Sequence, residues 1–227
     1  MSEDRHSRSV AEPLITDKLE RAKRESENGL RQIDLVLERA GRHIGPNAEP
    51  FKLRPSLLLM LNRAAVEGIE ATAGAFRTGR MEIFGSKHKP PIGADVPELV
   101  EELCDYVNDH WSTASAAHLA AYVMWRINWI HPFDDGNGRT ARAASYLVLL
   151  AKTGSVLPGA KTIPERIAAS KNPYYFALEK ADKAYANDKA IDVSELEGIV
   201  VSALAAQLAD VVMDARGGSA SDADGKK

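Results

Sequence analysis

Apolar side chains recur at helical spacing along most of the chain. In the stretch 119–130, leucine, valine and two isoleucines fall on one stripe of a helix, because positions three or four apart share a face. Similar stripes run through residues 30–40, 139–152 and 200–211. A helix with one apolar stripe is stable mainly when that stripe packs against another element. The sequence therefore predicts an all-α fold, a helical bundle.

The charge balance and the cysteine content argue against several classes of protein. The 227 residues carry 29 Lys and Arg against 32 Asp and Glu, a net charge of −3. Proteins that bind nucleic acids or membrane surfaces usually carry an excess of basic residues. We therefore expect no nucleic-acid partner and no membrane partner. Cys104, the single cysteine, supplies neither a disulfide framework nor a thiolate zinc site. The polar N-terminus lacks a signal-peptide pattern and no apolar run is expected to span a bilayer, so we expect a cytoplasmic location.

The two ends of the chain differ in composition from the rest. Residues 1–13 mix charges with serine, and residues 216–227 consist of small and charged residues. Both compositions favour disorder. Between them no repeat or linker interrupts residues 14–215, which we expect to form a single helical domain.

One internal segment departs from the helical pattern. Residues Met81–Ile92 contain two short extended pieces around a Gly-Ser-Lys turn, and Pro90-Pro91 prevents a helix. The segment predicts a β-hairpin on a helical body. The alternative is a surface connector without function.

A turn-rich stretch between two apolar stripes predicts an anion site. Asp135-Gly136-Asn137-Gly138 is typical of turns, and the second helix is expected to begin at about Asn137 or Gly138. The first N–H groups of a helix have no partner within the helix, and the helix dipole is positive there. Glycines let a phosphate approach such amides closely.

Charged side chains around this turn add the groups that phosphate chemistry needs. Arg139 and Arg142 are three residues apart, so both guanidiniums project from one face of the helix. Asp135 can hold Mg²⁺, which prefers one or two carboxylates together with substrate phosphates. His131 can take a proton near neutral pH. The combination predicts phosphate-ester chemistry on a nucleotide, with a solvated turn and surface arginines as the alternative.

Residues 131–142 resemble the signature of the Fic/Doc family, His-Pro-Phe-x-Asp/Glu-Gly-Asn-Gly-Arg-x-x-Arg, and every fixed position matches. The resemblance extends from about Glu25 to Leu208. It implies a Fic-type helical bundle with a small β-hairpin flap ahead of the motif, where Met81–Ile92 lies. It also implies a nucleotidyltransferase that performs AMPylation, the transfer of AMP from ATP to a Ser, Thr or Tyr hydroxyl of a target protein.

The resemblance implies a role for each motif residue. His131 would deprotonate the target hydroxyl, and Asp135 would hold Mg²⁺ at the α- and β-phosphates. The phosphates of ATP would be bound by Gly136, Asn137, Gly138, Arg139 and Arg142. The Phe133 side chain would anchor the loop in the core.

Further positions match the family outside the motif. Tyr174 and Tyr175 would line an adenine pocket, with packing in the core as the alternative reading. Ile83 and Phe84 would cover the nucleotide, and an unidentified target protein would dock on the flap through backbone hydrogen bonds. Where the family commonly has an asparagine, this chain has Asp182, which puts that contact in doubt.

The N-terminal region resembles the inhibitory helix of some Fic proteins, Ser/Thr-x-x-x-Glu-Gly/Asn. Glu27-Asn28 fits the end of that pattern, whereas Lys23 occupies the Ser/Thr position. The resemblance implies that Glu27 pairs with Arg142 and disturbs the γ-phosphate site. A solvated helix face with a Lys23–Glu27 pair is the alternative.

Other readings remain open for the function. Doc-like members of the family transfer phosphate, but they carry lysine where this chain has Gly138. Other members remove AMP, in which case Glu27 would orient a water molecule. From a different class, the chain could be a catalytically silent binding module or the inert half of a toxin–antitoxin pair. The sequence leaves the target and the oligomeric state open.

Overall fold

The computed structural model describes residues 14–159 and 161–221, and within these ranges the chain is mostly helical. The elements in chain order are α1 (Lys18–Gly41), α2 (Pro55–Val66), the 3-10 turn η1 (Gly93–Asp95), α3 (Val96–Asp109), α4 (Ala116–Ile130), α5 (Asn137–Thr153), α6 (Ile163–Ala169), α7 (Lys171–Asp188) and α8 (Ser194–Ser221). The predicted all-α class is confirmed.

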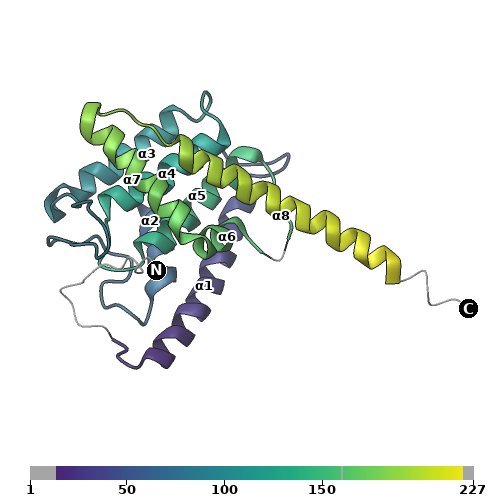
Figure 1. Ribbon diagram of the computed structural model, residues 1–227, viewed down its shortest axis with the longest axis horizontal. Coiled ribbons are helices and arrows are strands. Elements are labelled where there is room, and N and C mark those ends of the chain that lie inside the picture. The colour runs from purple at the N-terminus through teal and green to yellow at the C-terminus, as the bar shows by residue number, and fades with distance from the viewer. Residues whose placement is uncertain (1–13, 160, 222–227) are drawn as a thin grey trace, which may run out of the picture.

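Helices α4 and α5 form the centre of the bundle (Figure 1). Every residue of α4 from Leu119 to Ile127 is buried, so this helix is covered on all sides rather than along one stripe. Helices α1 and α2 pack against α5, while α3, α7 and α8 pack against α4. The loop that joins α4 to α5 therefore starts and ends in the core, which fixes the position of the motif.

The buried face of α1 differs from the predicted apolar stripe. Leu30 is 65% exposed, whereas Asn28 and Gln32 are buried together with Val36 and Ala40. The Asn28 amide donates to the carbonyl oxygens of Ala65 (3.2 Å) and Glu67 (3.0 Å), and the Gln32 amide donates to that of Leu61 (2.8 Å). Two polar side chains thus occupy the core face because they donate to carbonyl groups of α2 and of Glu67 just beyond its end.

Helix α8 is longer than expected and extends beyond the other helices (Figure 1). It continues to Ser221, so the first residues of the tail that we expected to be disordered are helical in their backbone. The rest of that tail and the lead-in 1–13 lie outside the described residues. The part Ser194–Met213 is long and apolar enough to cross a membrane by length and composition alone, with 22% of its apolar window buried. The expectation that no apolar run reaches this length was therefore wrong.

The segment Met81–Ile92 is an irregular loop, and residues 14–159 and 161–221 contain no β-strand. A turn closes with a hydrogen bond from the Ser86 N–H to the Ile83 carbonyl (3.2 Å), and Gly85 at its centre has φ +72°. The predicted turn is present, but the predicted hairpin is not. Pro90 and Pro91 lack the N–H groups that a strand on this side would need for pairing.

Candidate functional site

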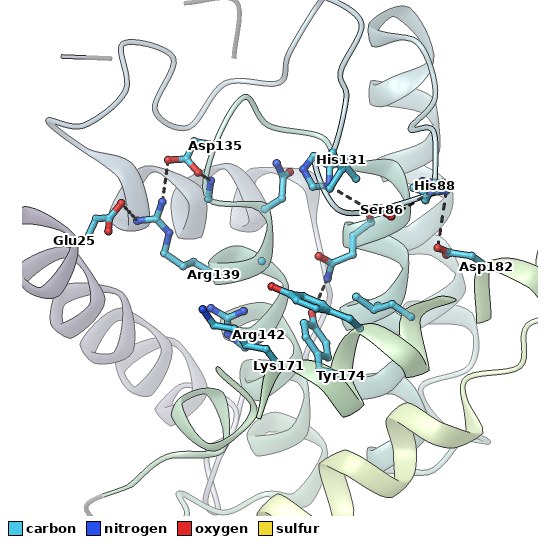
Figure 2. A pocket seen from close by; sticks show the side chains of 17 residues that line it. Glu25, Ser86, His88, His131, Asp135, Arg139, Arg142, Lys171, Tyr174 and Asp182 are labelled. Atoms are coloured by element: carbon cyan, nitrogen blue, oxygen red, sulfur yellow. Dashed lines mark hydrogen bonds and ion pairs between the residues drawn. The ribbon is translucent and has the colours of Figure 1, made fainter. Parts of the chain in front are cut away.

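A cavity of about 510 Å³ lies where the α4–α5 loop meets α1, α7 and the segment Met81–Ile92. Figure 2 shows the 17 side chains that line it. The volume is in the range of small-molecule sites. Most residues that the sequence predicted for the site line this cavity: Ile83, His131, Asp135, Gly136, Asn137, Gly138, Arg139, Arg142, Tyr174 and Tyr175.

His131 follows the last residue of α4, and its surroundings favour one tautomer of the neutral ring. Its backbone is left-handed (φ 52°), and its N–H donates to the Ile127 carbonyl (2.8 Å). Its Nδ1 lies 3.2 Å from the Asn128 carbonyl oxygen. Because a carbonyl only accepts hydrogen bonds, Nδ1 carries the proton and Nε2 is the basic nitrogen. Burial lowers the pKa of His131 to about 4, so the ring is neutral near pH 7 and can accept a proton at Nε2.

Arg77 holds the backbone around His131. This arginine is 2% exposed, and its guanidinium donates to the carbonyl oxygens of His131 (2.6 Å), Ile130 (3.1 Å) and Pro91 (2.7 Å). Burial lowers the pKa of Arg77 from its usual value. Arg77 thus satisfies the carbonyl groups at the C-terminal end of α4 and ties them to the end of the Met81–Ile92 loop.

The start of α5 requires glycine. Gly136 has φ +78°, and a Cβ there would lie 2.6 Å from the Val66 Cγ1. The first helical hydrogen bond runs from the Thr140 N–H to the Gly136 carbonyl (2.8 Å). The N–H groups of residues 137–139 therefore remain outside the helical bonding pattern at the end of α5 that borders the cavity, where an anion is favoured.

Asn137 uses its side chain to close the loop rather than to reach a ligand. Its Oδ1 accepts from the Phe133 N–H (2.9 Å), and its Nδ2 donates to the Phe133 carbonyl (2.7 Å). Phe133 itself is buried and lies against Phe76. Asn137 can therefore contribute a backbone amide to a phosphate, while its amide side chain keeps the loop in shape.

The Asp135 carboxylate already has several hydrogen-bond donors. Its Oδ1 accepts from the Gly136 N–H (2.5 Å), and its Oδ2 accepts from Arg139 (3.0 Å) and Arg21 (2.8 Å). Within the described ranges no group of three or more His, Cys, Asp or Glu side chains could form a metal cage. The donor set fits Mg²⁺ held by one protein carboxylate together with substrate phosphates.

The two motif arginines have different surroundings. Arg139 donates to the Ala65 carbonyl (3.1 Å) besides Asp135, and its Nη1 lies 3.8 Å from the Glu25 carboxylate. The Arg142 guanidinium is hydrogen-bonded to Tyr174, and burial lowers its pKa from the usual value. Among the described residues it has no carboxylate partner, so no anionic side chain there compensates its charge. This leaves Arg142 suited to an anionic ligand.

Two tyrosine side chains form a further part of the cavity wall. Tyr174 is buried, and its hydroxyl accepts from the Asn128 amide (2.8 Å). Tyr175 lies beside it, with ring centroids 5.9 Å apart. Asp182 also lines the cavity and accepts from the Trp125 indole N–H (2.9 Å). The tyrosine pair therefore both packs in the core and lines the cavity.

The Met81–Ile92 loop contributes different residues from those predicted. Ile83, Ser86 and His88 line the cavity, whereas Phe84 is 43% exposed and does not. Phe84 therefore does not line the cavity in this structure, and its contact with a nucleotide stays a prediction. The His88 Nε2 lies 2.7 Å from the Trp129 carbonyl oxygen, which fastens the loop to α4.

The predicted inhibitory pairing requires a contact between Glu27 and Arg142, and the structure does not contain this contact. The Glu27 carboxylate lies 3.8 Å from the Arg24 Nε, and both side chains are about half exposed. Glu25, two residues earlier on α1, lines the cavity instead (Figure 2). Buried Asn28 fixes the rotation of α1, and that rotation directs Glu27 to solvent.

Several residues of the site carried no local signal in the sequence. Arg21, Asn62 and Arg77 meet the motif across 54 to 114 residues of chain. Asn62 donates to the Asp135 carbonyl (2.9 Å) and accepts from the Gly74 N–H (3.0 Å). Each is an ordinary polar residue on a helix or loop, so only the packing reveals its role.

A nucleotide-sized cavity between a buried histidine and a helix N-terminus is the kind of site that phosphate-transferring enzymes use. The profile of the Fic/DOC family matches residues 52–149. Two curated relatives are both called Protein adenylyltransferase Fic. The one from Drosophila persimilis is 32% identical over 95 residues, which cover 41% of this chain and 18% of that protein. The one from Drosophila yakuba is 30% identical over 129 residues, covering 56% and 24%. This chain thus matches at most about a quarter of these relatives.

Solved structures share the fold at low sequence identity. Fic-1 from C. elegans has a TM-score of 0.67 at 20% identity, covering 90% of this chain and 55% of that one. A Fic domain containing signaling protein from Bacteroides thetaiotaomicron also has a TM-score of 0.67 at 20% identity, covering 87% and 74%. Residues 52–149 are therefore a Fic/DOC family domain, and the surrounding helices complete the helical fold of such proteins.

Proposed function

We propose that this chain is a protein adenylyltransferase that transfers AMP from ATP to a Ser, Thr or Tyr hydroxyl of a target protein. The observation that carries the proposal is a neutral, buried His131 in a nucleotide-sized cavity that also holds the α5 N-terminus and Arg142. The names of the curated relatives support the same activity.

In the proposed reaction His131 acts as the general base. The target hydroxyl gives its proton to Nε2 while its oxygen attacks the α-phosphorus of ATP. The bond between the α-phosphorus and the bridging oxygen breaks, and pyrophosphate leaves with that oxygen. The bond from Nδ1 to the Asn128 carbonyl (3.2 Å) keeps the ring in the required tautomer and orientation.

The phosphates are bound by the start of α5 and by cationic side chains. Backbone N–H groups of Asn137 and Gly138 would face developing negative charge without reorganising, and Gly136 would shape the turn that brings them to the phosphates. Arg142 and Arg139 bind the outer phosphates, with Lys171 also lining the cavity. Asp135 would hold Mg²⁺, whose contribution is to neutralise charge on the phosphates.

The remaining surfaces have proposed roles in recognition. Tyr174 and Tyr175 line the cavity and would contact adenine, with Ile83 covering the nucleotide. The target protein would dock on the Met81–Ile92 loop, whose backbone can order on binding as an added strand pairs with it. This ordering would form the hairpin that the sequence predicted.

Parallel incubation with α-labelled and γ-labelled ATP, with and without Mg²⁺, tests the proposal. Label from the α position on protein, dependent on Mg²⁺, is the expected result. Label from the γ position alone would replace the proposal with phosphate transfer. Gly138 argues against that outcome, because the resemblance gives the phosphate-transferring members a lysine at this position. Label from neither position would leave the silent binding module.

A further inference from the structure

The Arg21 guanidinium on α1 lies between two carboxylates at the edge of the cavity. Its Nη2 is 2.8 Å from the Asp135 Oδ2 and 3.4 Å from the Glu70 Oε1. Asp135 is the residue that would hold Mg²⁺, whereas Glu70 has no part in the proposed transfer. The guanidinium nitrogen is within ion-pair distance of both carboxylates. It therefore occupies a position where the two carboxylates would also attract a metal cation.

Glu70 depends on this arginine for its charge compensation. Its side chain is 5% exposed, and its Oε2 has no hydrogen-bond partner among the described residues. Its ion-pair partner there is Arg21. A buried carboxylate is costly unless a cation or hydrogen-bond donors compensate it. The unsatisfied Oε2 is therefore an oxygen ligand available to a cation that could replace the guanidinium.

Helix α1 places a side chain of opposite charge beside Asp135 and another beside Arg139. Arg21 and Glu25 are one turn apart and pair with each other (3.3 Å). Arg21 contacts the carboxylate of Asp135, and Glu25 lies 3.8 Å from the Arg139 guanidinium. The helix thus supplies a cation at the proposed metal ligand and an anion at a proposed phosphate ligand.

We infer that Arg21 competes with a divalent cation for Asp135, and that Glu70 becomes a second carboxylate ligand when Arg21 withdraws. The cation belongs to the class of Mg²⁺ and Mn²⁺, which take carboxylate oxygens directly or through retained water. The inference rests on the proposed function only in the assignment of Asp135 as a metal ligand. Contacts of α1 would then set the affinity of the site for metal before any nucleotide binds.

Binding of Mn²⁺ to the full chain without nucleotide, followed by electron paramagnetic resonance, tests this inference. Arg21→Met keeps the length of the side chain without its charge, and we expect it to bind Mn²⁺ at least tenfold more tightly than the wild type. Arg24→Met is the matched control, because Arg24 lies on the same helix in an exposed pair with Glu27, and it should bind like the wild type. Adding Glu70→Gln to Arg21→Met should abolish most of the gain.

Equal affinity of Arg21→Met and the wild type would overturn the competition, and a full gain in the double variant would overturn the role of Glu70. If Arg21→Met does not fold, amide hydrogen exchange of the wild type decides instead. Saturating Mn²⁺ should then speed exchange near Arg21, where displacement loosens the start of α1, and unchanged exchange would contradict the inference. Neither readout uses ATP, so a failed labelling experiment would refute the transfer reaction without affecting this result.

Discussion

The Nδ1 atom of His131 lies 3.2 Å from the carbonyl oxygen of Asn128, one turn earlier on the same helix. The relationship assigns the proton to Nδ1 and the basic lone pair to Nε2. Asn128 also donates to the Tyr174 hydroxyl (2.8 Å). One residue therefore links the proposed base to the proposed nucleobase end of the cavity.

The pKa of His131 gives a prediction that is independent of any substrate. Burial disfavours the charged ring and lowers this pKa to about 4, below the usual 6.5. In an NMR titration of the free protein, the His131 ring should remain neutral as the pH falls through 6.5 and titrate only near pH 4. Comparison with His131→Gln assigns the signal. A midpoint near 6.5 would contradict the buried environment.

The same shift affects stability, with a defined sign. Because the folded pKa is lower than the unfolded one, the unfolded chain binds more protons between pH 6.5 and about 4. The contribution of neutral His131 is complete above pH 6.5 and is lost as the pH falls toward 4. Urea unfolding should therefore show a steeper loss of stability over this window for the wild type than for His131→Gln. The same pH dependence of the unfolding free energy in both proteins would contradict a lowered pKa of His131.

Arg142 should distinguish ATP from ADP. The guanidinium has no carboxylate partner among the described residues and is proposed to meet the γ-phosphate in charge-assisted hydrogen bonds. Calorimetric titration of Arg142→Ala should show a loss of ATP affinity of roughly tenfold or more, with a smaller loss for ADP. Arg24→Ala, outside the cavity, should change neither. Equal losses for both nucleotides would place Arg142 elsewhere on the ligand.

Gly136 should be more costly to replace than another glycine with positive φ. At Gly154 (φ +65°) an added Cβ meets nothing within 4 Å, whereas at Gly136 it lies 2.6 Å from Val66. Gly154→Ala should lose about 1 to 2 kcal/mol from backbone strain alone. Gly136→Ala should lose a further ~1 to 3 kcal/mol from the steric clash, as measured by urea unfolding. Equal losses would mean that the loop shifts without cost.

Glu25 rather than Glu27 should restrain nucleotide binding. The Glu25 carboxylate lies 3.8 Å from Arg139 and adds negative charge inside the cavity. Glu25→Gln should therefore raise ATP affinity by roughly threefold to tenfold, in line with a partly exposed ion pair of about 1 kcal/mol, and should raise incorporation of α-labelled AMP. Glu27→Gln on the same helix is the matched control. A gain in Glu27→Gln alone would restore the inhibitory pairing implied by the sequence.

Local patterns in the sequence sufficed for much of this structure. The stripe in 119–130 predicted α4, and the turn chemistry after Asp135 placed the start of α5 within a residue. The site residues within the motif were found because they are close in sequence. These features depend on neighbouring residues, so periodicity and turn preferences reveal them.

Packing between distant segments determined the rest. The choice between Glu25 and Glu27 depends on the rotation of α1, which buried Asn28 sets through carbonyl groups of α2. Because a polar residue such as Asn28 is not expected on a buried helix face, the apolar periodicity predicted the wrong buried face for α1. The bridging role of Arg21 and the absence of a hairpin at Met81–Ile92 likewise depend on partners far along the chain.

The central claim is that His131 is the general base of AMP transfer, and His131→Ala tests it most directly. Incorporation of α-labelled AMP should fall by roughly 10²- to 10⁴-fold, as for loss of a general base, while calorimetry shows ATP affinity close to that of the wild type. Labelling by His131→Ala at the wild-type rate, with ATP still bound, would contradict the account.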